Sequence, residues 1–255
     1  MVVEIDGLIE RFEAVNLQEL DKARLLNRVD TKFLLCEGSM HAVLADMAPQ
    51  YDALSIEDKR FSRYHTVYFD TPDFALYNQH HNDRANRYKV RCRKYVETGI
   101  SFLEVKQKTN KRRTVKNRLE IPELPTRFNS SSMAFLDYHY PMQTHILEPV
   151  IWNRFRRATL VSKCRSERAT IDLDLTYGWG VKEGCLTSVG IVEVKQAKFN
   201  PDSPLVHRLR AEGVRPMGFS KYCAAMMEIY PYLKRNRFKR RSLLIDHLQH
   251  QRGSQ

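Results

Sequence analysis

The chain has 255 residues, 42% of them hydrophobic, and its net charge of +12 predicts a polyanionic partner such as nucleic acid, a membrane surface or a phosphorylated molecule. Its five cysteines are scattered and never spaced as Cys-x-x-Cys, which argues against a disulfide framework or a zinc site. No apolar run is long enough to span a bilayer and no signal peptide is recognisable, so we expect a cytoplasmic protein.

The N-terminal part of the chain changes from a helical to a strand-like pattern. Residues 4–26 have helical spacing, with a second helical piece expected from about residue 16. Residues 28–35 then alternate, which places Lys32 on the same face as Asp30. A short amphipathic helix is expected over residues 40–47.

The centre of the chain predicts a run of strands with charged faces. We expect strands over residues 64–69, 87–95, 102–108 and 114–120, and a helix over residues 72–81 that begins at a proline. In the second strand Arg91 and Arg93 share a face, and in the fourth Lys116 shares one with Arg118.

The second half is predicted to continue this sheet and to end in helices. Residues 122–142 are weakly patterned and are expected to hold helices and a connector. We expect strands over residues 150–160, 168–175 and 191–197, and helices over 203–211 and 219–229. We assign residues 1–232 to one domain and residues 233–255 to a basic C-terminal helix and tail.

Two of these strands are near copies of each other. Phe-Leu-Glu-Val-Lys-Gln-Lys begins at Phe102, and Ile-Val-Glu-Val-Lys-Gln-Ala begins at Ile191. In a strand, Glu104 and Lys106 lie on one face with the apolar residues on the other, and the second copy repeats this arrangement. A face that carries carboxylates and ammonium groups together suggests a site for a polyanion and its metal ion.

The strands taken together predict an α+β fold whose sheet is a closed antiparallel β-barrel of about eight strands, with a charged interior, flanked by helices. An ordinary antiparallel sheet with one solvated face is the alternative for any single strand. However, like charges side by side across strands destabilise a sheet unless something neutralises them. A barrel of about eight strands is just wide enough to hold one extended ligand.

Seven short motifs occur together in a recognisable order. They are Arg28-Val-Asp-Thr-Lys32, Tyr68-Phe-Asp-Thr-Pro72, Lys89-Val-Arg-Cys-Arg93, Phe102-Leu-Glu-Val-Lys106, Thr170-Ile-Asp-Leu-Asp174, Ile191-Val-Glu-Val-Lys195 and Gly218-Phe-Ser-Lys-Tyr222. The set resembles the VTC (vacuolar transporter chaperone) polyphosphate polymerase domain in its bacterial stand-alone form, over about residues 24–232. That domain is one of the triphosphate tunnel metalloenzymes, which are related to the CYTH group.

The resemblance implies an activity and a set of residues. The activity is transfer of the terminal phosphate of ATP to a growing polyphosphate chain in a tunnel, with Mn²⁺ or Mg²⁺ as cofactor, and ATP and polyphosphate or triphosphate as partners. The implied phosphate-binding and catalytic residues are Lys32, Arg91, Arg93, Lys106, Lys116, Arg156 and Lys221. Further ligand-binding groups are Arg154, Ser220 and Arg118, and the metal ligands are Glu193 with Glu104 and Asp172.

Two other activities stay open at this point. The hydrolase branch of the superfamily carries Glu-x-Glu-x-Lys where this chain reads Arg28-Val-Asp-Thr-Lys32, which weakens the case for a metal-dependent triphosphatase. A non-catalytic polyanion-binding module is the other alternative. Nucleic acid is a poor candidate because acidic residues share the basic strands and no zinc finger, Gly-rich phosphate loop or RNA-binding signature occurs. Asp172 and Asp174 either bind metal or pair with arginines inside the barrel.

Overall fold

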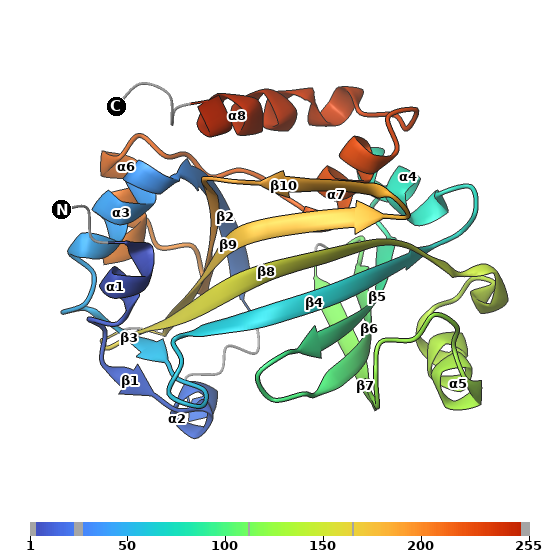
Figure 1. Ribbon diagram of the computed structural model, residues 1–255, viewed down its shortest axis with the longest axis horizontal. Coiled ribbons are helices and arrows are strands. Elements are labelled where there is room, and N and C mark those ends of the chain that lie inside the picture. Colours follow the sequence, from blue (N-terminus) through green and yellow to red (C-terminus); the bar gives the residue numbers. More distant parts are fainter. Residues whose placement is uncertain (1–3, 23–27, 112, 165, 251–255) are drawn as a thin grey trace.

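The computed structural model describes residues 4–22, 28–111, 113–164 and 166–250, which form one large sheet flanked by helices (Figure 1). The strands are β1 Ala14–Val15, β2 Val29–Cys36, β3 Tyr51–Leu54, β4 Phe61–Asp70, β5 Arg87–Tyr95, β6 Ser101–Lys108, β7 Thr114–Ile121, β8 Glu148–Ser162, β9 Glu167–Trp179, β10 Lys182–Leu186 and β11 Val189–Gln196. The helices are α1 Ile5–Ile9, α2 Leu17–Lys22, α3 Glu37–Ala45, α4 Ala75–His81, α5 Ser130–His139, α6 Pro204–Ala211, α7 Lys221–Ile229 and α8 Lys239–His250, with 3₁₀ turns at Thr144–Ile146 and Asn236–Phe238.

The main path of the sheet runs β2-β11-β9-β8-β4-β5-β6-β7, and every neighbouring pair along it is antiparallel. Three short strands extend it, because β10 pairs with β9, β3 pairs with β8, and β1 runs parallel to β3. The α+β class and the large antiparallel sheet predicted from the sequence are therefore confirmed.

The N-terminal segment differs from its prediction. Its apolar stripe does face the core, since Ile5, Leu8, Ile9 and Phe12 are all buried. The helix nevertheless ends at Ile9, because the chain then joins the sheet as β1. The remaining helical turns lie in α2, and residues 23–26 of the predicted segment lie outside the described residues.

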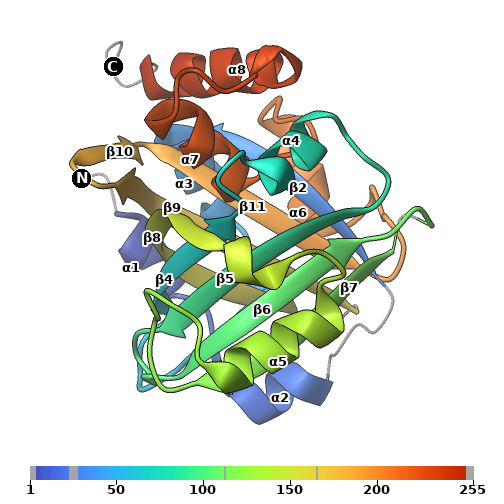
Figure 2. The ribbon, with the colours of Figure 1, turned by 90° about the vertical axis from the view of Figure 1, so that its right-hand side faces the viewer.

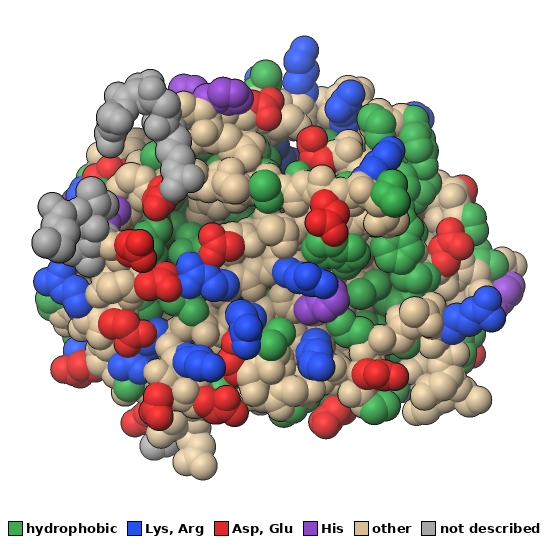
Figure 3. Space-filling model, viewed as in Figure 1, with side chains coloured by type: hydrophobic (Ala, Val, Ile, Leu, Met, Phe, Trp, Pro, Cys, Tyr) green, Lys and Arg blue, Asp and Glu red, His purple; other side chains and the backbone are tan. Residues whose placement is uncertain are grey.

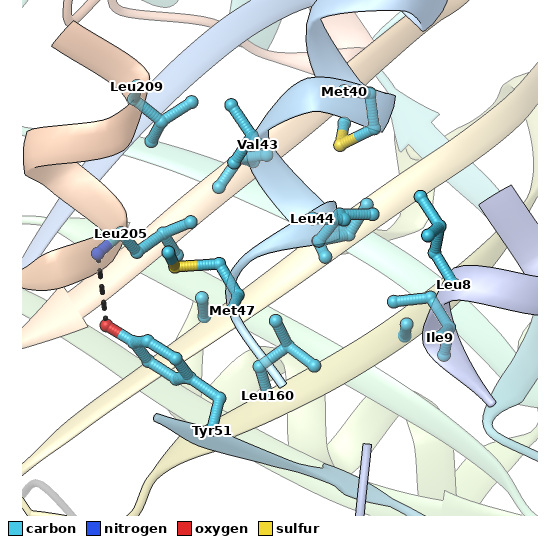
Figure 4. Close-up of a cluster of buried hydrophobic side chains, with 14 of the residues drawn as sticks. Leu8, Ile9, Met40, Val43, Leu44, Met47, Tyr51, Leu160, Leu205 and Leu209 are labelled. Atoms are coloured by element: carbon cyan, nitrogen blue, oxygen red, sulfur yellow. Dashed lines mark hydrogen bonds between the residues drawn. The ribbon is translucent and has the colours of Figure 1, made fainter. Parts of the chain in front are cut away.

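Three helices cover the outer face of the sheet at one end. Helices α1, α3 and α6 pack on β8, β9 and β11 through a cluster that includes Leu8, Val43 and Leu205 (Figure 4). Helix α6 begins where the sequence predicts, because the Ser203 hydroxyl accepts a hydrogen bond from the amide of Val206, 3.3 Å away. Burying this apolar face stabilises the strands that carry the charged side chains on the opposite face.

A second cluster lies on the outer face of the other half, where α5 packs on the strands β6 and β7 (Figure 2). The third cluster lies on the inner face of the sheet, where α7 and α8 pack on apolar residues such as Tyr68, Phe155 and Ile191. Ile245 and Leu248 anchor α8 in this cluster, so the basic C-terminal segment is a packed helix as far as His250. None of the helices in the described part of the chain is long and apolar enough to cross a membrane.

The sheet curls but is not closed by hydrogen bonds. Within the described residues, its path ends at β2 on one side and β7 on the other, with no pairing between them. The closed barrel predicted from the sequence is therefore not confirmed.

A bulge in β9 overturns one prediction of register. Simple alternation predicts that Asp172 and Asp174 share a face. Asp174 has a φ of 54°, however, and the pairing of β8 with β9 shifts at this point. Asp172 is consequently buried on the inner face, whereas the Asp174 side chain is 62% exposed and pairs with Arg156 on the outer face.

Candidate functional site

Charged side chains from seven strands and one helix meet on the inner face of the curled sheet. We call this set the concave cluster. Its members are the cations Lys32, Lys89, Arg91, Arg93, Lys106, Lys116, Arg157, Lys195 and Lys221, and the carboxylates Glu104, Asp172 and Glu193. Nine cations against three carboxylates leave the cluster with a net charge of +6.

Glu104 of β6 is clamped between two cations from the neighbouring strands. Its carboxylate accepts a hydrogen bond from Arg91 Nε at 2.6 Å and forms an ion pair with Lys116. Burial alone would raise the pKa of Glu104, which is 1% exposed, but Arg91, Arg93 and Lys116 outweigh burial and hold the pKa well below its usual range. Glu104 thereby fixes the position of Arg91 in the cluster.

Asp172 of β9 forms a second clamp that joins the sheet to α7. Arg157 of β8 donates to both of its oxygens, at 2.5 and 2.8 Å, and Lys221 at the start of α7 pairs with it as well. Burial would raise the pKa of Asp172, but Arg157 and Lys221 lower it far below the normal value. A bidentate pair of this kind holds the guanidinium in one orientation.

Glu193 of β11 forms the third clamp. Lys32 and Lys195 each lie 3.1 Å from one of its oxygens, and Lys195 also donates to the Thr170 hydroxyl at 3.0 Å. Burial opposes ionisation of Glu193, but Lys195, Lys32 and Arg157 lower its pKa well below the usual range. Glu193 is thus ionised at neutral pH.

Two lysines of the cluster lack a carboxylate partner. Lys89 donates to the hydroxyl of Ser220 at 3.0 Å, and Ser220 is the N-cap of α7, so the start of that helix points into the cluster. Lys106 takes part in no ion pair or hydrogen bond with the described residues. Burial, together with the charges of Lys32 and Lys89, lowers the pKa of Lys106 to about 7.

Aromatic rings support the arginines of the cluster. Arg93 donates to the Thr66 hydroxyl at 3.1 Å, and its guanidinium lies 5.3 Å from the ring centre of Tyr64 and 5.6 Å from that of Phe155. Tyr68 lies beside these arginines. Although burial opposes ionisation, Arg91, Arg93 and Lys89 lower the pKa of Tyr68 to about 8, which reports the strong positive potential of this face.

A cavity of about 160 Å³ opens beside the third clamp. Arg28, Thr159, Arg168, Thr170 and Lys195 line it. Its cations and hydroxyl groups extend the concave cluster toward the end of the sheet away from α7.

The carboxylates of this face make the folded state sensitive to acid, which is our first prediction. Glu104 and Asp172 have folded-state pKa values below those of the unfolded chain, so the unfolded state binds more protons as the pH falls below about 5. The stability they contribute is present above an unfolded pKa of about 4 and is lost toward the lower folded pKa. The free energy of unfolding should fall by about 1.4 kcal/mol per pH unit for each of the two groups. Urea unfolding at a series of pH values measures this slope.

A variant provides the control for that slope. Glu104→Gln removes one of the titrating carboxylates of this face. The free energy of unfolding of the variant should therefore fall less steeply with decreasing pH, by about 1.4 kcal/mol per pH unit. An unchanged slope in the variant would show that Glu104 does not titrate as described.

The structure does not bring all the residues implied by the sequence together. Arg156 lies on the outer face, where Asp6 and Asp174 pair with it at 2.7 and 2.5 Å. Arg154 is exposed on the same outer face. Arg118 is on the inner face of the edge strand β7, but its guanidinium packs on the ring of Phe102, 4.6 Å away, rather than in a clamp.

Three members of the concave cluster are absent from the residues implied by the sequence. Lys89 shares the alternating face of Arg91 and Arg93, and Lys195 lies on the second Glu-Val-Lys strand, so alternation could have found both. Arg157 takes the inner position on β8. Its position two residues after Phe155 places both side chains on one face of the strand, which could have indicated this. However, three arginines lie close together in this part of the sequence, so the sequence alone did not show which of them faces inward.

The carboxylates named as metal ligands do not form a protein-only cage. Each belongs to a different clamp, and among the described residues no group of three or more His, Cys, Asp or Glu side chains could hold an ion. Mg²⁺ is commonly bound by one or two carboxylates together with substrate phosphates. The oxygens of Glu193 suit an ion held in that way once Lys32 and Lys195, which now pair with them, turn to the phosphate chain.

Comparisons with known proteins place the chain in context. No curated protein matches it. Among solved structures, a candidate adenylate cyclase from Bacillus halodurans is 13% identical, with a TM-score of 0.49 over 76% of this chain and 94% of its own. A candidate adenylyl cyclase from Hippeastrum, with a dominant triphosphatase activity, is 14% identical, with a TM-score of 0.48 over 79% of this chain and 96% of its own. The family model of the VTC domain matches residues 27–230, which span the concave cluster from Lys32 to Lys221, and the chain therefore belongs to the VTC domain family.

Proposed function

We propose that the protein is a polyphosphate polymerase, which transfers the γ-phosphate of ATP to a growing polyphosphate chain on the concave face of its sheet. One observation carries this proposal: nine cations surround three carboxylates there, and Lys106 and Lys89 have no carboxylate partner. Membership of the VTC domain family supports it. A triphosphate carries about four negative charges at neutral pH, which the net charge of +6 can neutralise.

Phosphoryl transfer requires positioned charge more than covalent catalysis. In our proposal Arg91 and Arg157, fixed by Glu104 and Asp172, hold phosphate oxygens in bidentate pairs. Lys106 acts as a point charge that is free to approach the phosphate chain. These groups stabilise the charge that develops on the transferred phosphoryl group and on the leaving oxygen.

Glu193 would hold Mn²⁺ or Mg²⁺ together with the phosphate chain. An ion held there would neutralise charge on the phosphate oxygens. Lys32 and Lys195, which hold Glu193 in place, lie close enough to contact the same phosphates once they leave the carboxylate.

The acceptor distinguishes a polymerase from a triphosphatase. A phosphate acceptor is already ionised at neutral pH and needs no general base, whereas water needs activation. Among the described residues the concave cluster contains no histidine, and its carboxylates are each engaged by two cations. These features favour transfer to phosphate over transfer to water.

Incubation of the purified protein with ATP and Mn²⁺ tests the proposal. Long-chain polyphosphate and ADP are the expected products. Free phosphate without polyphosphate would identify a triphosphatase, and the absence of turnover would identify a binding module. Either of these outcomes overturns the proposal.

The metal role of Glu193 leads to a second prediction. Glu193→Gln should lower turnover by about 10²–10³-fold, since one positioned electrostatic group is commonly worth that much. Metal-free binding of inorganic triphosphate should not weaken, because the substitution removes a negative charge and frees Lys32 and Lys195. Titration of Mn²⁺ in the presence of triphosphate, followed by electron paramagnetic resonance, should show weaker Mn²⁺ binding.

Glu13→Gln is the matched control for Glu193→Gln. Glu13 pairs with Lys163 at 3.1 Å, but its side chain is 78% exposed and lies outside the concave cluster. The control should bind Mn²⁺ and turn over like the unmodified protein. Equal Mn²⁺ affinity in the two variants would remove Glu193 as the metal ligand.

A further inference from the structure

A bare part of the outer face carries a row of basic residues. Helices cover the outer face at both ends of the sheet but leave the middle of β4 and β8 open (Figure 1). On this side the space-filling view shows Lys and Arg side chains gathered with a histidine (Figure 3). Lys94 of β5, His65 of β4 and Arg154 of β8 lie directly opposite one another in the register. We call these three residues the outer basic row.

The row faces away from the concave cluster. Successive side chains of a strand point to opposite faces, and the residues next to His65 are Tyr64 and Thr66. Thr66 binds Arg93 by a hydrogen bond, and Tyr64 lies against the same guanidinium, so both face inward. A ligand on the outer basic row is therefore separated from the concave cluster by the thickness of the sheet.

The neighbouring arginines on this face are neutralised. Arg63 pairs with Glu97 at 2.9 Å, and Arg156 pairs with Asp174 at 2.5 Å. They provide an internal comparison, because they lie on the same strands and on the same face as His65 and Arg154. A cation on this surface thus commonly has a carboxylate beside it.

The outer basic row lacks such partners. Lys94 and Arg154 form no ion pair with any described residue, although like charges opposite each other destabilise a sheet. Burial, and then Arg154 and Lys94, lower the pKa of His65, so the row has a positive potential with no local anion to offset it. The row therefore presents an unneutralised cationic surface to anions in solution.

Arg154 is held in place by the packing beneath it. Its guanidinium lies 4.9 Å from the ring centre of Trp152. The indole in turn lies over Gly178, where a Cβ atom would come within 2.7 Å of Trp152 Cζ2. Since Trp152 packs between Gly178 and Arg154, its ring is not open for stacking by a nucleobase, which disfavours single-stranded nucleic acid as the ligand.

We propose that the outer basic row binds inorganic polyphosphate along the outside of the sheet. Strands lie about 4.8 Å apart, so the row from Lys94 to Arg154 spans about 10 Å, which suits several successive phosphates of a linear chain. The choice of polyphosphate among linear polyanions rests on the proposed function. Such a site keeps a long chain on the protein while one of its ends occupies the concave cluster.

Direct binding measurements on the full chain, without nucleotide, test this site. The test variant is Lys94→Glu with Arg154→Glu, and the control is Lys239→Glu with Arg240→Glu, which changes the net charge equally on the exposed face of α8. The probes are long-chain polyphosphate, inorganic triphosphate and a single-stranded oligonucleotide, each titrated at several salt concentrations. Arg154, Lys239 and Arg240 are exposed and Lys94 is partly exposed, so both variants should keep a melting temperature close to that of the unmodified protein.

The expected result is specific for one probe. The test variant should bind long-chain polyphosphate about tenfold more weakly, with the salt dependence reduced by about two counterions, while triphosphate binds as before. The control should bind polyphosphate within about twofold of the unmodified protein. An equal loss in both variants, or no loss in the test variant, overturns the proposal. A loss for the oligonucleotide alone also overturns it and assigns the row to nucleic acid. These results do not depend on turnover, so a protein that proved to be a triphosphatase would still be informative.

Discussion

Lys106→Met should make the protein more stable and nearly inactive. The charged form of Lys106 is disfavoured in the folded state, because burial and then Lys32 and Lys89 lower its pKa to about 7. Removing this charge should raise the free energy of unfolding by about 1–3 kcal/mol at neutral pH. The same charge is free to bind phosphate in the proposed reaction, so turnover should fall by about 10²–10³-fold. Urea unfolding and steady-state kinetics measure the two effects.

The pH dependence of binding gives an independent measure of the same lysine. Below pH 7 the ammonium is present before and after binding, so the affinity for inorganic triphosphate is at its maximum. Above about pH 7 the free protein must take up a proton to bind, and the affinity should fall by up to about tenfold per pH unit until the pKa of the bound state is reached.

Lys106→Arg is the control for this pH dependence. Its guanidinium stays protonated over the whole range, whereas the ligand titrates identically with both proteins. The difference between the two profiles therefore isolates the lysine. Identical profiles, or a Lys106→Met protein that is active or less stable, would show that Lys106 is not the free cation of the cluster.

Alternation predicted most of the concave cluster because the direction in which the side chains of a strand point depends only on the φ and ψ angles of that strand. Arg91, Glu104 and Lys116 lie on three successive strands, and their shared face follows from period two alone. What alternation could not give was the pairing between strands. The two-cation clamp on each carboxylate depends on register, which long-range contacts determine.

The failures of prediction have local physical causes. The bulge at Asp174 needs a residue with positive φ, which a non-glycine sequence does not announce. The short strand β1 forms because Ala53 and Ser55 donate backbone hydrogen bonds to Glu13 and Val15, although the segment reads as a helix. Closure of the barrel depends on pairing between the two edge strands β2 and β7, and the spacing of residues within a strand does not report this.

Arg157→Lys should reduce turnover by about 10- to 100-fold, whereas Arg156→Lys should leave it within about twofold. The adjacent arginines test the register of β8, since Arg157 faces the concave cluster, whereas Arg156 pairs with exposed carboxylates on the outer face of the sheet. Lysine keeps the charge beside Asp172 but loses the bidentate pair whose two distances are 2.5 and 2.8 Å. The loss should therefore appear in turnover rather than in folding.

Removing the charge at the two positions sharpens the contrast. Arg157→Ala leaves buried Asp172 with Lys221 alone and should lower the free energy of unfolding by about 3–5 kcal/mol, the usual cost of breaking a buried ion pair. Arg156→Ala breaks pairs with carboxylates that are more than half exposed, Asp6 and Asp174, and should cost less than about 1 kcal/mol. If Arg156→Ala proved the more damaging of the two, β8 would face the other way. A larger loss of stability at Arg157 is the expected result, because Arg157 and Lys221 together hold the buried Asp172 and so join β8 and β9 to the start of α7.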